Sequence, residues 1–238
     1  REVQQNLLPR NNPAVKGLDI AGKSIYCDET GGDYFDFLEN DDLDDGRFAV
    51  VIGDVSEHGI PSALLMATAR AFIRQRSALS GDISRVVSDV NRQLTRDVED
   101  TGRFMTLFYL LIDPGRGHLQ WVRAGHDAAL IYDPATDQFE ELGGEGIALG
   151  IDQDWRYQSF ERSGLRSGQI IILSTDGLWE AQDGQGKMFG KEAIYDLVRR
   201  NASAGAGQLL DTLLYAVTRF QKDQPPTDDI TLAIIKVK

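Results

Sequence analysis

The sequence predicts an α+β protein in which helices cover stacked antiparallel sheets. Short β-like runs are joined by turn residues, and pairs of helical patterns interrupt them without the regular strand–helix alternation of βαβ units. The chain has 238 residues, of which 42% are hydrophobic, and no internal repeat or Gly/Ser linker divides it. We therefore expect one compact domain with a layered core.

Three hairpins are predicted in chain order. Residues 34–54 read as two strands around an acidic turn that closes with Asp45-Gly46, and residues 104–126 read as two more around Pro114. Residues 128–142 supply the third hairpin. Because each run alternates or clusters apolar residues over a short length between turn signals, antiparallel pairing is expected.

Helices are predicted where apolar residues recur at helical spacing. Residues 58–76 carry Pro61 at a position that a first helical turn tolerates. Small and apolar residues then share one face of this helix: Ala63, Leu64, Ala67 and Ala71. The pattern of residues 83–98 is amphipathic, with Ile83, Val86, Val87, Val90 and Leu94 on one side. Residues 207–221 repeat that pattern, and all three helices are expected to cover sheets.

Acidic residues stand at the ends of buried strands. The apolar runs at 49–52, 170–173 and 230–237 are flanked by Asp54, Asp176, Asp228 and Asp229. Any one acid is explained by a solvated turn or a helix cap. Their recurrence favours another explanation, because a carboxylate beside a buried strand is costly unless something positive neutralises it. No Lys or Arg adjoins Asp54, Asp176 or Asp228 in sequence.

A divalent cation would neutralise such a cluster. Oxygen-only ligand sets select hard ions such as Mg²⁺ or Mn²⁺. Zinc favours Cys and His, and this chain has one Cys and three His. Pairs of hard ions activate water and hold phosphoryl oxygens during hydrolysis. The acids thus predict a site for a hard divalent cation, which is compatible with hydrolysis of a phosphate ester.

Several other phosphate chemistries fail on the residues themselves. A cysteine-nucleophile phosphatase needs Arg at the sixth position after the cysteine, but Asp33 stands there after Cys27. A haloacid dehalogenase mechanism needs Asp-x-Asp, whereas Ser56 follows Asp54 at the second place. The acidic run NDDLDDG has Leu43 at the third ligand position of an EF-hand, so we interpret it as a hairpin turn.

Composition narrows the partners and the compartment. The formal net charge of −12 argues against binding to a phosphate backbone, so no nucleic-acid partner is expected. The lone Cys27 cannot form an internal disulfide, and no apolar stretch approaches 18 residues. We expect a cytoplasmic domain without membrane contact. The start REVQQNLLPR, which lacks Met, suggests a piece of a longer protein.

Five segments resemble, in order, the motifs of the bacterial SpoIIE/RsbU-type serine/threonine phosphatases, a branch of the metal-dependent PP2C-like (PPM) superfamily. They are TGGDYFDF, VVIGDVSEHGIPSALLMA, RAGHDAALIY, STDGLWEA and TDDITLAII. The resemblance runs from about Leu18 to Val237. It implies a four-layer αββα sandwich of two antiparallel sheets flanked by helices, with the metal site at one edge. It also implies that residues 1–13 are a linker or connecting helix and residues 14–238 the catalytic domain.

The resemblance implies a role for each acid. Asp54 would bridge two Mn²⁺ or Mg²⁺ ions beside the Val55 carbonyl, and Asp176 and Asp228 would complete the shell of the second ion. Asp33 would serve the first ion, with Glu29 just before it. Asp229 is expected to support the ligands without binding an ion, since successive strand residues point to opposite faces. Four glycines would let the backbone pass close to the ions: Gly31, Gly32, Gly53 and Gly177.

The implied activity is hydrolysis of phosphoserine or phosphothreonine by a water that two ions activate, without a phosphoenzyme. The implied substrate is a bacterial signalling phosphoprotein, typically an anti-sigma-factor antagonist of the STAS class. An upstream sensory or receiver domain would control the module, and residues 3–10, the tail of the connecting helix, would also offer a homodimer contact. Two alternatives stay open: a pseudophosphatase that acts as a binding module, and a hydrolase of small phosphate esters.

Some residues depart from the family or invite other roles. Glu57 stands where the family usually has Gly or a basic residue, which places another acid close to the site. We expect structural roles for His58 and His126, because a metal-activated water needs no histidine base. No proposed step uses Cys27.

Overall fold

The computed structural model of the chain describes residues 2–39, 47–79, 81–222, 226 and 228–238. Its elements, in chain order, are α1 (Glu2–Gln5), β1 (Leu18–Ile25), β2 (Tyr34–Leu38), β3 (Phe48–Val55), α2 (Ile60–Ser77), α3 (Ile83–Val98), β4 (Met105–Asp113), β5 (His118–Ala124), β6 (Ala129–Asp133), β7 (Gln138–Leu142), β8 (Phe160–Ser163), β9 (Ile170–Ser174), α4 (Gly177–Glu180), α5 (Lys191–Arg200), α6 (Ala206–Gln221) and β10 (Ile230–Val237). The predicted mixture of hairpins and helices is confirmed.

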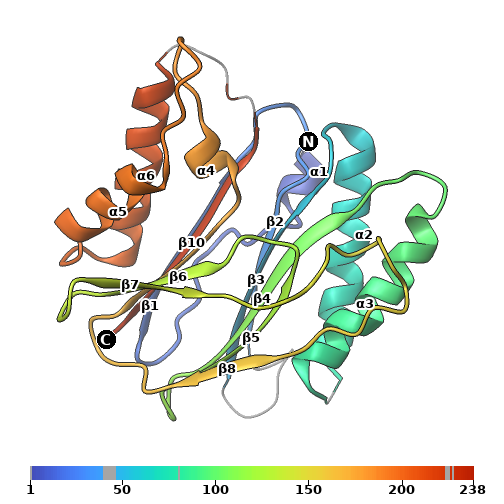
Figure 1. Cartoon of the computed structure of the whole chain (residues 1–238), viewed down its shortest axis with the longest axis horizontal. Coiled ribbons are helices and arrows are strands. Elements are labelled where there is room, and N and C mark those ends of the chain that lie inside the picture. Colours follow the sequence, from blue (N-terminus) through green and yellow to red (C-terminus); the bar gives the residue numbers. More distant parts are fainter. Residues whose placement is uncertain (1, 40–46, 80, 223–225, 227) are drawn as a thin grey trace.

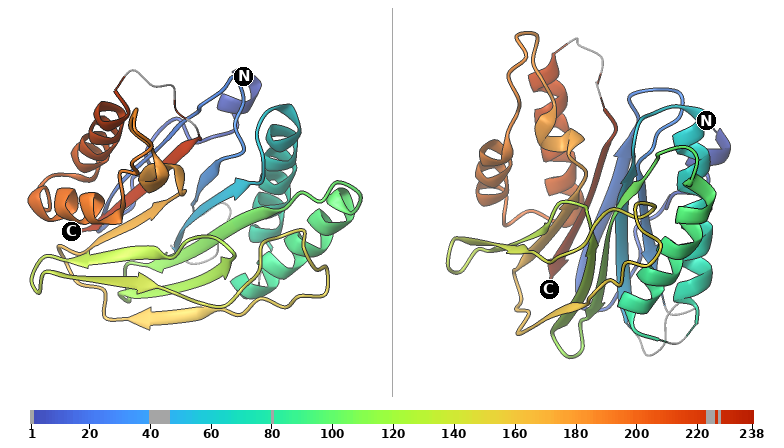
Figure 2. Two further views of the ribbon diagram at one scale, coloured as in Figure 1. Left: turned by 45° about the horizontal axis from the view of Figure 1, so that its top comes forward. Right: turned by 45° about the vertical axis from the view of Figure 1, so that its right-hand side comes forward.

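Two antiparallel five-stranded sheets pack against each other, with helices on their outer faces (Figure 1 and Figure 2). One sheet has the strand order β1-β10-β9-β6-β7, and the other has the order β2-β3-β4-β5-β8. Helices α5 and α6 lie on the outer side of the first sheet, and α2 and α3 cover the second (Figure 2). The resulting layers are helix, sheet, sheet, helix, so the predicted αββα sandwich is confirmed.

The central strands are buried on both faces, as their unbroken apolar runs predict. In β9, Ile171 and Leu173 join the core between the two sheets, which also includes the inner faces of α2 and α3. Ile170 and Ile172 point the other way, into the core under α5 and α6. Since side chains alternate along a strand, one run of four apolar residues serves two cores. This double burial ties the four layers together.

Helix α3 behaves as the sequence predicts. Its buried side includes all five of the residues that its periodicity places there: Ile83, Val86, Val87, Val90 and Leu94. Asp82 caps its first turn by accepting a hydrogen bond from the Ser84 N–H at 2.7 Å. The cap and the apolar stripe therefore fix where α3 begins and which way it faces.

The buried face of α2 differs from the predicted one. The core side carries Leu65, Met66 and Ile73, whereas Leu64 is 64% exposed. Alanine is compatible with either face of a helix, so the alanine spacing was a poor guide and the bulky residues decide the orientation. Leu64, with Ala63 and Ala67, lines a groove of about 610 Å³ between α1 and α2.

Several features lie outside what the sequence patterns predicted. The strands β1 and β8 and the helix α5 were not among the predicted elements; β8 in particular alternates partly and fully exposed positions. The predicted acidic turn, including Leu43 and Asp45, lies outside the described residues. Among the described helices, none has the length and apolar character needed to cross a bilayer.

A buried ion pair fixes α2 to the second sheet. The Asp36 side chain on β2 is 1% exposed and accepts hydrogen bonds from Nε and Nη2 of Arg74, each at 2.7 Å. Arg70 Nε lies 3.6 Å from the same carboxylate, and the Tyr34 hydroxyl donates to it at 3.1 Å. Such a bidentate pair holds the helix at one register against the strand.

Asp36→Asn is expected to lower the free energy of unfolding by about 2 kcal/mol, because two arginines lose their buried counter-charge. Asp89→Asn is the matched control, since Asp89 also pairs with two arginines, at 2.8 and 3.1 Å, but is 31% exposed. It should cost less than about 1 kcal/mol. Urea unfolding of both variants measures the difference. An equal loss of unfolding free energy in the two variants would show that the buried Asp36 pair stabilises the protein no more than the exposed Asp89 pair.

Candidate functional site

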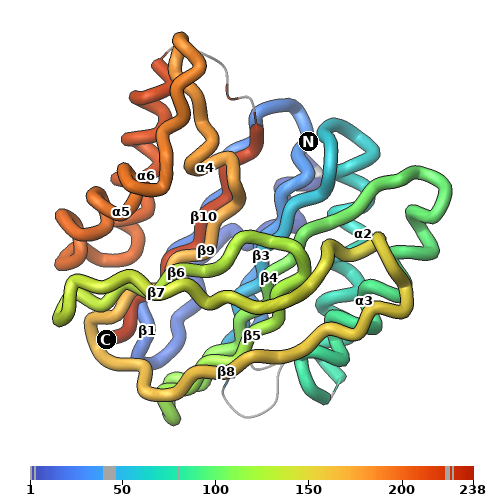
Figure 3. The backbone as a smooth tube through the Cα atoms, viewed as in Figure 1, coloured from blue at the N-terminus to red at the C-terminus, as the bar shows by residue number. Residues whose placement is uncertain are grey.

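Four strand ends bring acids to one edge of the sandwich. Asp33 directly precedes β2, and Asp54 lies at the end of β3, where Tyr34 pairs with Gly53. Asp176 follows β9, and Asp228 stands two residues before β10. Because β2 and β3 are antiparallel, as are β9 and β10, each pair places its two acids at the same end. In Figure 3 these ends lie together near the turns into α2 and α4.

A threonine links the two sheets at this edge. The Thr175 hydroxyl, between β9 and Asp176, donates to Oδ2 of Asp33 at 2.9 Å. The Thr175 hydroxyl oxygen in turn accepts the N–H of Thr231 at 3.0 Å, which connects Thr175 to β10. Asp33 is only 1% exposed, so this bond sets the orientation of its carboxylate. Sequence reasoning missed Thr175, although it stands inside the STDG motif.

The carboxylates repel one another. Burial, followed by the nearby carboxylates of Asp228, Asp176 and Asp229, raises the pKa of Asp54 to about 8, against a hydrogen bond with Asp33 that lowers it. Burial and then Asp54 hold the pKa of Asp33 well above its ordinary value. The two innermost acids therefore share an environment that disfavours full ionisation.

The other two acids sit further out. Desolvation, followed by the charges of Asp228 and Asp127, raises the pKa of Asp176. The pKa of Asp228 is raised by desolvation and by Asp229 and Glu180. All four predicted ligands are thus brought into one electrostatic group. Asp127 is an acid of this group that sequence reasoning missed, although it follows His126 in the RAGHDAALIY segment.

Asp229 holds the loop that carries Asp33. Its buried carboxylate, 4% exposed, accepts the N–H of Cys27 at 2.8 Å and that of Asp33 at 3.5 Å. Both oxygens are therefore engaged with the backbone of residues 27–33. This arrangement agrees with a supporting position and leaves the neighbouring Asp228 facing the cluster. Glu29, by contrast, is exposed and lines the groove beside α2.

Glycines allow the backbone segments to meet. A Cβ on Gly32 would lie 2.7 Å from the Val55 carbonyl oxygen and 3.2 Å from Oδ1 of Asp54. A Cβ on Gly31 would overlap the Asp229 carboxylate, and one on Gly177 would overlap the Asp229 carbonyl oxygen. Close approach is the reason for glycine at these positions. The Val55 carbonyl oxygen thus lies near the Asp54 carboxylate, and its role as a ligand stays a prediction.

The donor set has the chemistry that Mg²⁺ or Mn²⁺ requires. It consists of carboxylates and a carbonyl, and the raised pKa values of Asp33 and Asp54 mark carboxylates whose charges are not balanced by a neighbouring cation. Within the described residues, no three His, Cys, Asp or Glu side chains close around one point as a finished ligand shell. The residues therefore fit divalent ions by donor type and charge.

The two histidines occupy different surroundings. His126 is 4% exposed, and its Nδ1 lies 2.8 Å from the Thr106 hydroxyl, which also lies 3.4 Å from the Asp54 carbonyl oxygen. Burial lowers the pKa of His126 to about 4, so the ring is neutral at pH 7. His58 is open to solvent, with Nδ1 3.7 Å from Oδ2 of Asp28.

The Cys27 thiol stays protonated at neutral pH. Burial raises the pKa of its thiol to about 12, and its hydrogen bond with Asp229 acts in the same direction. A thiol that stays protonated is a poor nucleophile. This agrees with the expectation that no step uses Cys27.

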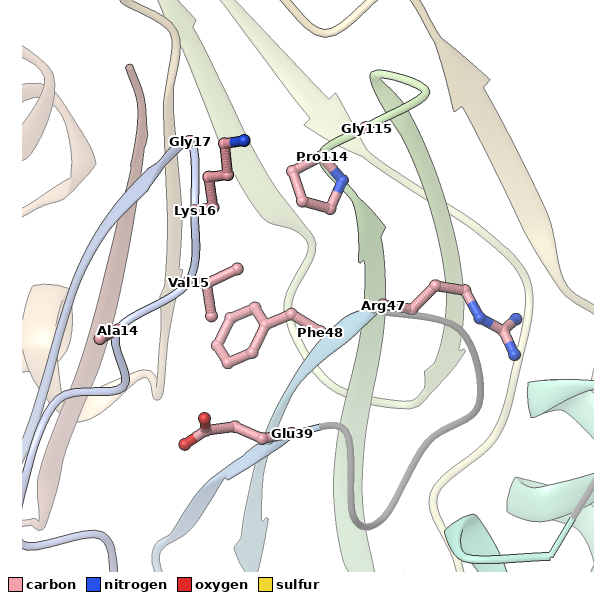
Figure 4. Close-up of a pocket in the computed structure, with 9 residues that line it drawn as sticks. All are labelled: Ala14, Val15, Lys16, Gly17, Glu39, Arg47, Phe48, Pro114 and Gly115. Atoms are coloured by element: carbon pink, nitrogen blue, oxygen red, sulfur yellow. The ribbon is translucent and has the colours of Figure 1, made fainter.

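A separate cavity lies at the opposite end of the sheets. Its volume is about 520 Å³, and Figure 4 shows Val15 and Phe48 side by side in its wall, with Lys16 and Pro114 above them. Pro114 follows the last residue of β4, whereas the first residues of that strand pair with Asp54 and Val55. This cavity is therefore remote from the acids.

Comparison with known proteins agrees with the geometry. Residues 44–238 match the family Stage II sporulation protein E (SpoIIE). The chain is 28% identical to phosphoserine phosphatase RsbU of Bacillus subtilis over 236 residues, which are 99% of this chain and 68% of RsbU. Across three of the curated relatives that it matches, the chain spans from 40% to 68% of their length.

Solved structures share the fold. The SiaA-PP2C domain of Pseudomonas aeruginosa superposes with a TM-score of 0.82 at 24% identity, covering 100% of this chain and 94% of that one. RsbX, solved in complex with magnesium, has a TM-score of 0.70 at 13% identity, covering 96% of this chain and 99% of that one. The family match shows that the chain belongs to the SpoIIE family, and the αββα layers together with these structures show that it has the PP2C-like fold.

Proposed function

We propose that this domain hydrolyses phosphoserine or phosphothreonine in a protein, at a site where Asp33, Asp54, Asp176 and Asp228 hold two Mn²⁺ or Mg²⁺ ions. The observation that carries the proposal is the buried pair Asp33 and Asp54, whose pKa values are raised by burial and by neighbouring acids. The name of the relative RsbU, a phosphoserine phosphatase, supports the substrate class. The magnesium in RsbX supports the choice of a hard ion.

The chain's own groups would orient the site. When bound, divalent ions withdraw charge from phosphoryl oxygens and make water a better nucleophile at neutral pH. Asp33 and Asp54 would hold them on the β2–β3 side, and Asp176 and Asp228 on the β9–β10 side. The Thr175 hydroxyl keeps Asp33 aimed into the cluster through its 2.9 Å bond. Neutral His126 holds Thr106 behind Asp54 and moves no proton.

The finer expectations about partners are part of the same proposal. We infer a STAS-class anti-sigma-factor antagonist as substrate, and an upstream regulatory domain joined through residues 1–13, with a possible homodimer contact there. The coverage of RsbU, 68% of its length, leaves room for a further domain in that relative. In this chain, Gln4 of α1 exchanges hydrogen bonds of 2.6 and 3.3 Å with the Gly31 backbone, two residues from Asp33. That contact supports a junction between residues 1–13 and the acids.

A pseudophosphatase is the second candidate function. The observation in its favour is that the acids of the described residues do not close into a finished ligand shell. The observation against it is that all four predicted ligands are present and grouped. Hydrolysis assays separate the two candidates directly.

Metal dependence is the first test. Hydrolysis of p-nitrophenyl phosphate and of a phosphoserine peptide should be lost in EDTA and return with excess Mn²⁺ or Mg²⁺, because every proposed ligand atom is an oxygen. Cys27→Ser should keep turnover close to that of the parent. Full activity in the chelator would contradict the proposal, and absence of activity under every metal condition would favour the pseudophosphatase.

The ligand assignment makes a second prediction. Asp54→Asn, Asp176→Asn and Asp228→Asn should each lose turnover by more than about 100-fold, and Asp54→Asn should also weaken Mn²⁺ binding in calorimetric titration. His126→Ala should stay within about tenfold, a barrier change below ~1.4 kcal/mol. If Asp54→Asn bound Mn²⁺ as tightly as the parent and still hydrolysed substrate, the assignment would be wrong.

The raised pKa of Asp54 predicts how metal-free stability changes with pH. The unfolded chain releases this proton near pH 4, whereas the folded chain keeps it until about pH 8. The unfolded state therefore binds fewer protons between these values, and the free energy of unfolding should fall as pH rises from 4 to 8.

The Asp54→Asn variant has no such proton to release. In EDTA, its free energy of unfolding should therefore fall less steeply with pH and exceed that of the parent at pH 8. Urea unfolding at pH 5, 6, 7 and 8 measures both slopes, with a limit of about 1.4 kcal/mol per pH unit for one proton. Asp89→Asn is the control and should follow the parent's slope. A parent stability that is flat or rises over this range, in EDTA, would show that Asp54 is ionised in the folded chain.

A further inference from the structure

We propose that Arg103 binds the phosphoryl group of the substrate. In the free protein the Glu57 carboxylate pairs with the Arg103 guanidinium, and the substrate phosphoryl group displaces this carboxylate when it binds. The inference rests on the proposed phosphatase function and adds to it a phosphate-binding residue and a competing carboxylate. Its basis is an ion pair of 2.6 Å between Arg103 Nη2 and Glu57 Oε2, placed at the border of the acidic cluster.

The position of this pair follows from the β3–β4 ladder. Asp54 pairs with Thr106, and Val55 with Met105. Beyond the strands, the pairing continues, because Ser56 N donates to the Phe104 carbonyl at 2.9 Å. Glu57 and Arg103 come next on either side. Arg103 is thus three residues from Thr106, which is about 10 Å along an extended chain.

The backbone of Glu57 borders the acids. A Cβ on Gly32 would lie 3.5 Å from the Glu57 carbonyl oxygen and 3.2 Å from Oδ1 of Asp54. One small segment therefore touches both the innermost acid and the residue that holds Arg103. A phosphoryl group delivered to the acids would arrive beside this ion pair.

Arg103 has unused binding capacity. Its side chain is 23% exposed, and its Nε is buried without a hydrogen-bond partner in the described residues. A guanidinium offers five donors in a planar fork that matches phosphate geometry. The Glu57 carboxylate is paired with Arg103 through Nη2. A phosphate, with three oxygens and more negative charge, would engage more of the fork.

Glu57 is suited to being displaced. Its side chain is 63% exposed, so its interaction with Arg103 is screened by solvent. Its φ of 65° lies in the left-handed region, where a non-glycine residue is strained. The Arg103 side chain also borders an open cavity of about 510 Å³ next to α3, so part of it is in contact with solvent.

The chain offers a matched control pair. Arg162 on β8 is 19% exposed, and its Nε lies 3.0 Å from Oε2 of Glu140 on β7, which is 52% exposed. Its Nη1 is also buried without a partner in the part of the chain that the structure describes. The two pairs have similar burial and charge, but the Arg162 pair lies on the outer strands β8 and β7, away from the acids. It tests whether losing any half-buried arginine has the same effect.

The experiment compares Arg103→Ala, Arg103→Lys, Glu57→Gln and the Arg103→Ala/Glu57→Gln double variant in the Mn²⁺-loaded protein. Arg103→Ala should raise KM for a phosphoserine peptide, and the inhibition constant of inorganic phosphate, by about 10- to 100-fold. Mn²⁺ affinity from calorimetry should stay within about twofold, because Arg103 contacts no proposed ligand. Arg103→Lys should recover part of the loss, since it restores the charge without the fork.

Glu57→Gln should act in the opposite direction and lower both constants by about threefold, because the competing carboxylate is gone. In the Arg103→Ala background the same change should have no effect. Arg162→Ala and Glu140→Gln should leave both constants unchanged. Melting temperatures of all variants identify any that fail to fold, and Glu57→Gln, at an exposed side chain, remains as an independent arm.

Unchanged KM and phosphate inhibition in folded Arg103→Ala would overturn the inference, and so would an equal shift in Arg162→Ala. Failure of the proposed function looks different, because the parent itself would then hydrolyse nothing. In that case, calorimetric titration of inorganic phosphate into Mn²⁺-loaded parent and Arg103→Ala still decides the matter. Phosphate binding that is absent from the parent, or equal in the two proteins, would reject a phosphate role for Arg103.

Discussion

Repulsion among carboxylates at one edge of the sandwich is the constraint on which the rest of the structure depends. Asp33 and Asp54 are desolvated, and the charges of neighbouring carboxylates raise the cost of ionising each of them. Such a cluster persists only if the scaffold holds it in place. The ladder between β2 and β3 and the ladder between β9 and β10 do so from two different sheets. The stability of the double core is what keeps these acids together.

The contacts around the cluster follow from that constraint. Thr175 donates a hydrogen bond to the buried Asp33 carboxylate, and Asp229 accepts hydrogen bonds from the loop before it, so the position of Asp33 is fixed from both sides. Cations are kept at a distance from the innermost acids. Arg74 is committed to Asp36, one layer away, and Arg103 is committed to Glu57 at the border. The centre is thereby left to oxygen donors, which is the condition for binding a hard cation.

Membership of the SpoIIE family connects the cluster of acids with the proposed hydrolysis of a phosphate ester. The β-sandwich supplies rigid strand ends, and short loops between them carry the reacting and binding groups. In this chain, β3 ends at Val55 beside the acids, and the loop that follows carries Glu57, which pairs with Arg103. A single turn therefore connects the proposed metal site with the proposed phosphate site. Helix α1 contacts the segment before Asp33 through the hydrogen bond between Gln4 and Gly31. A change in α1 would therefore alter the position of Asp33, and a change in the loop after β3 would alter that of Asp54.

The sequence by itself determined the hairpins, the face of α3 and the acids at strand ends, because these depend on local periodicity and on residues adjacent in the chain. Tertiary structure alone decided which side of α2 is buried, since its alanines suit either face. It also decided that Thr175 reaches Asp33, 142 residues away, and that Arg103 meets Glu57, 46 residues away. Contacts at such separations depend on how two sheets are paired and stacked, and no local pattern encodes that stacking.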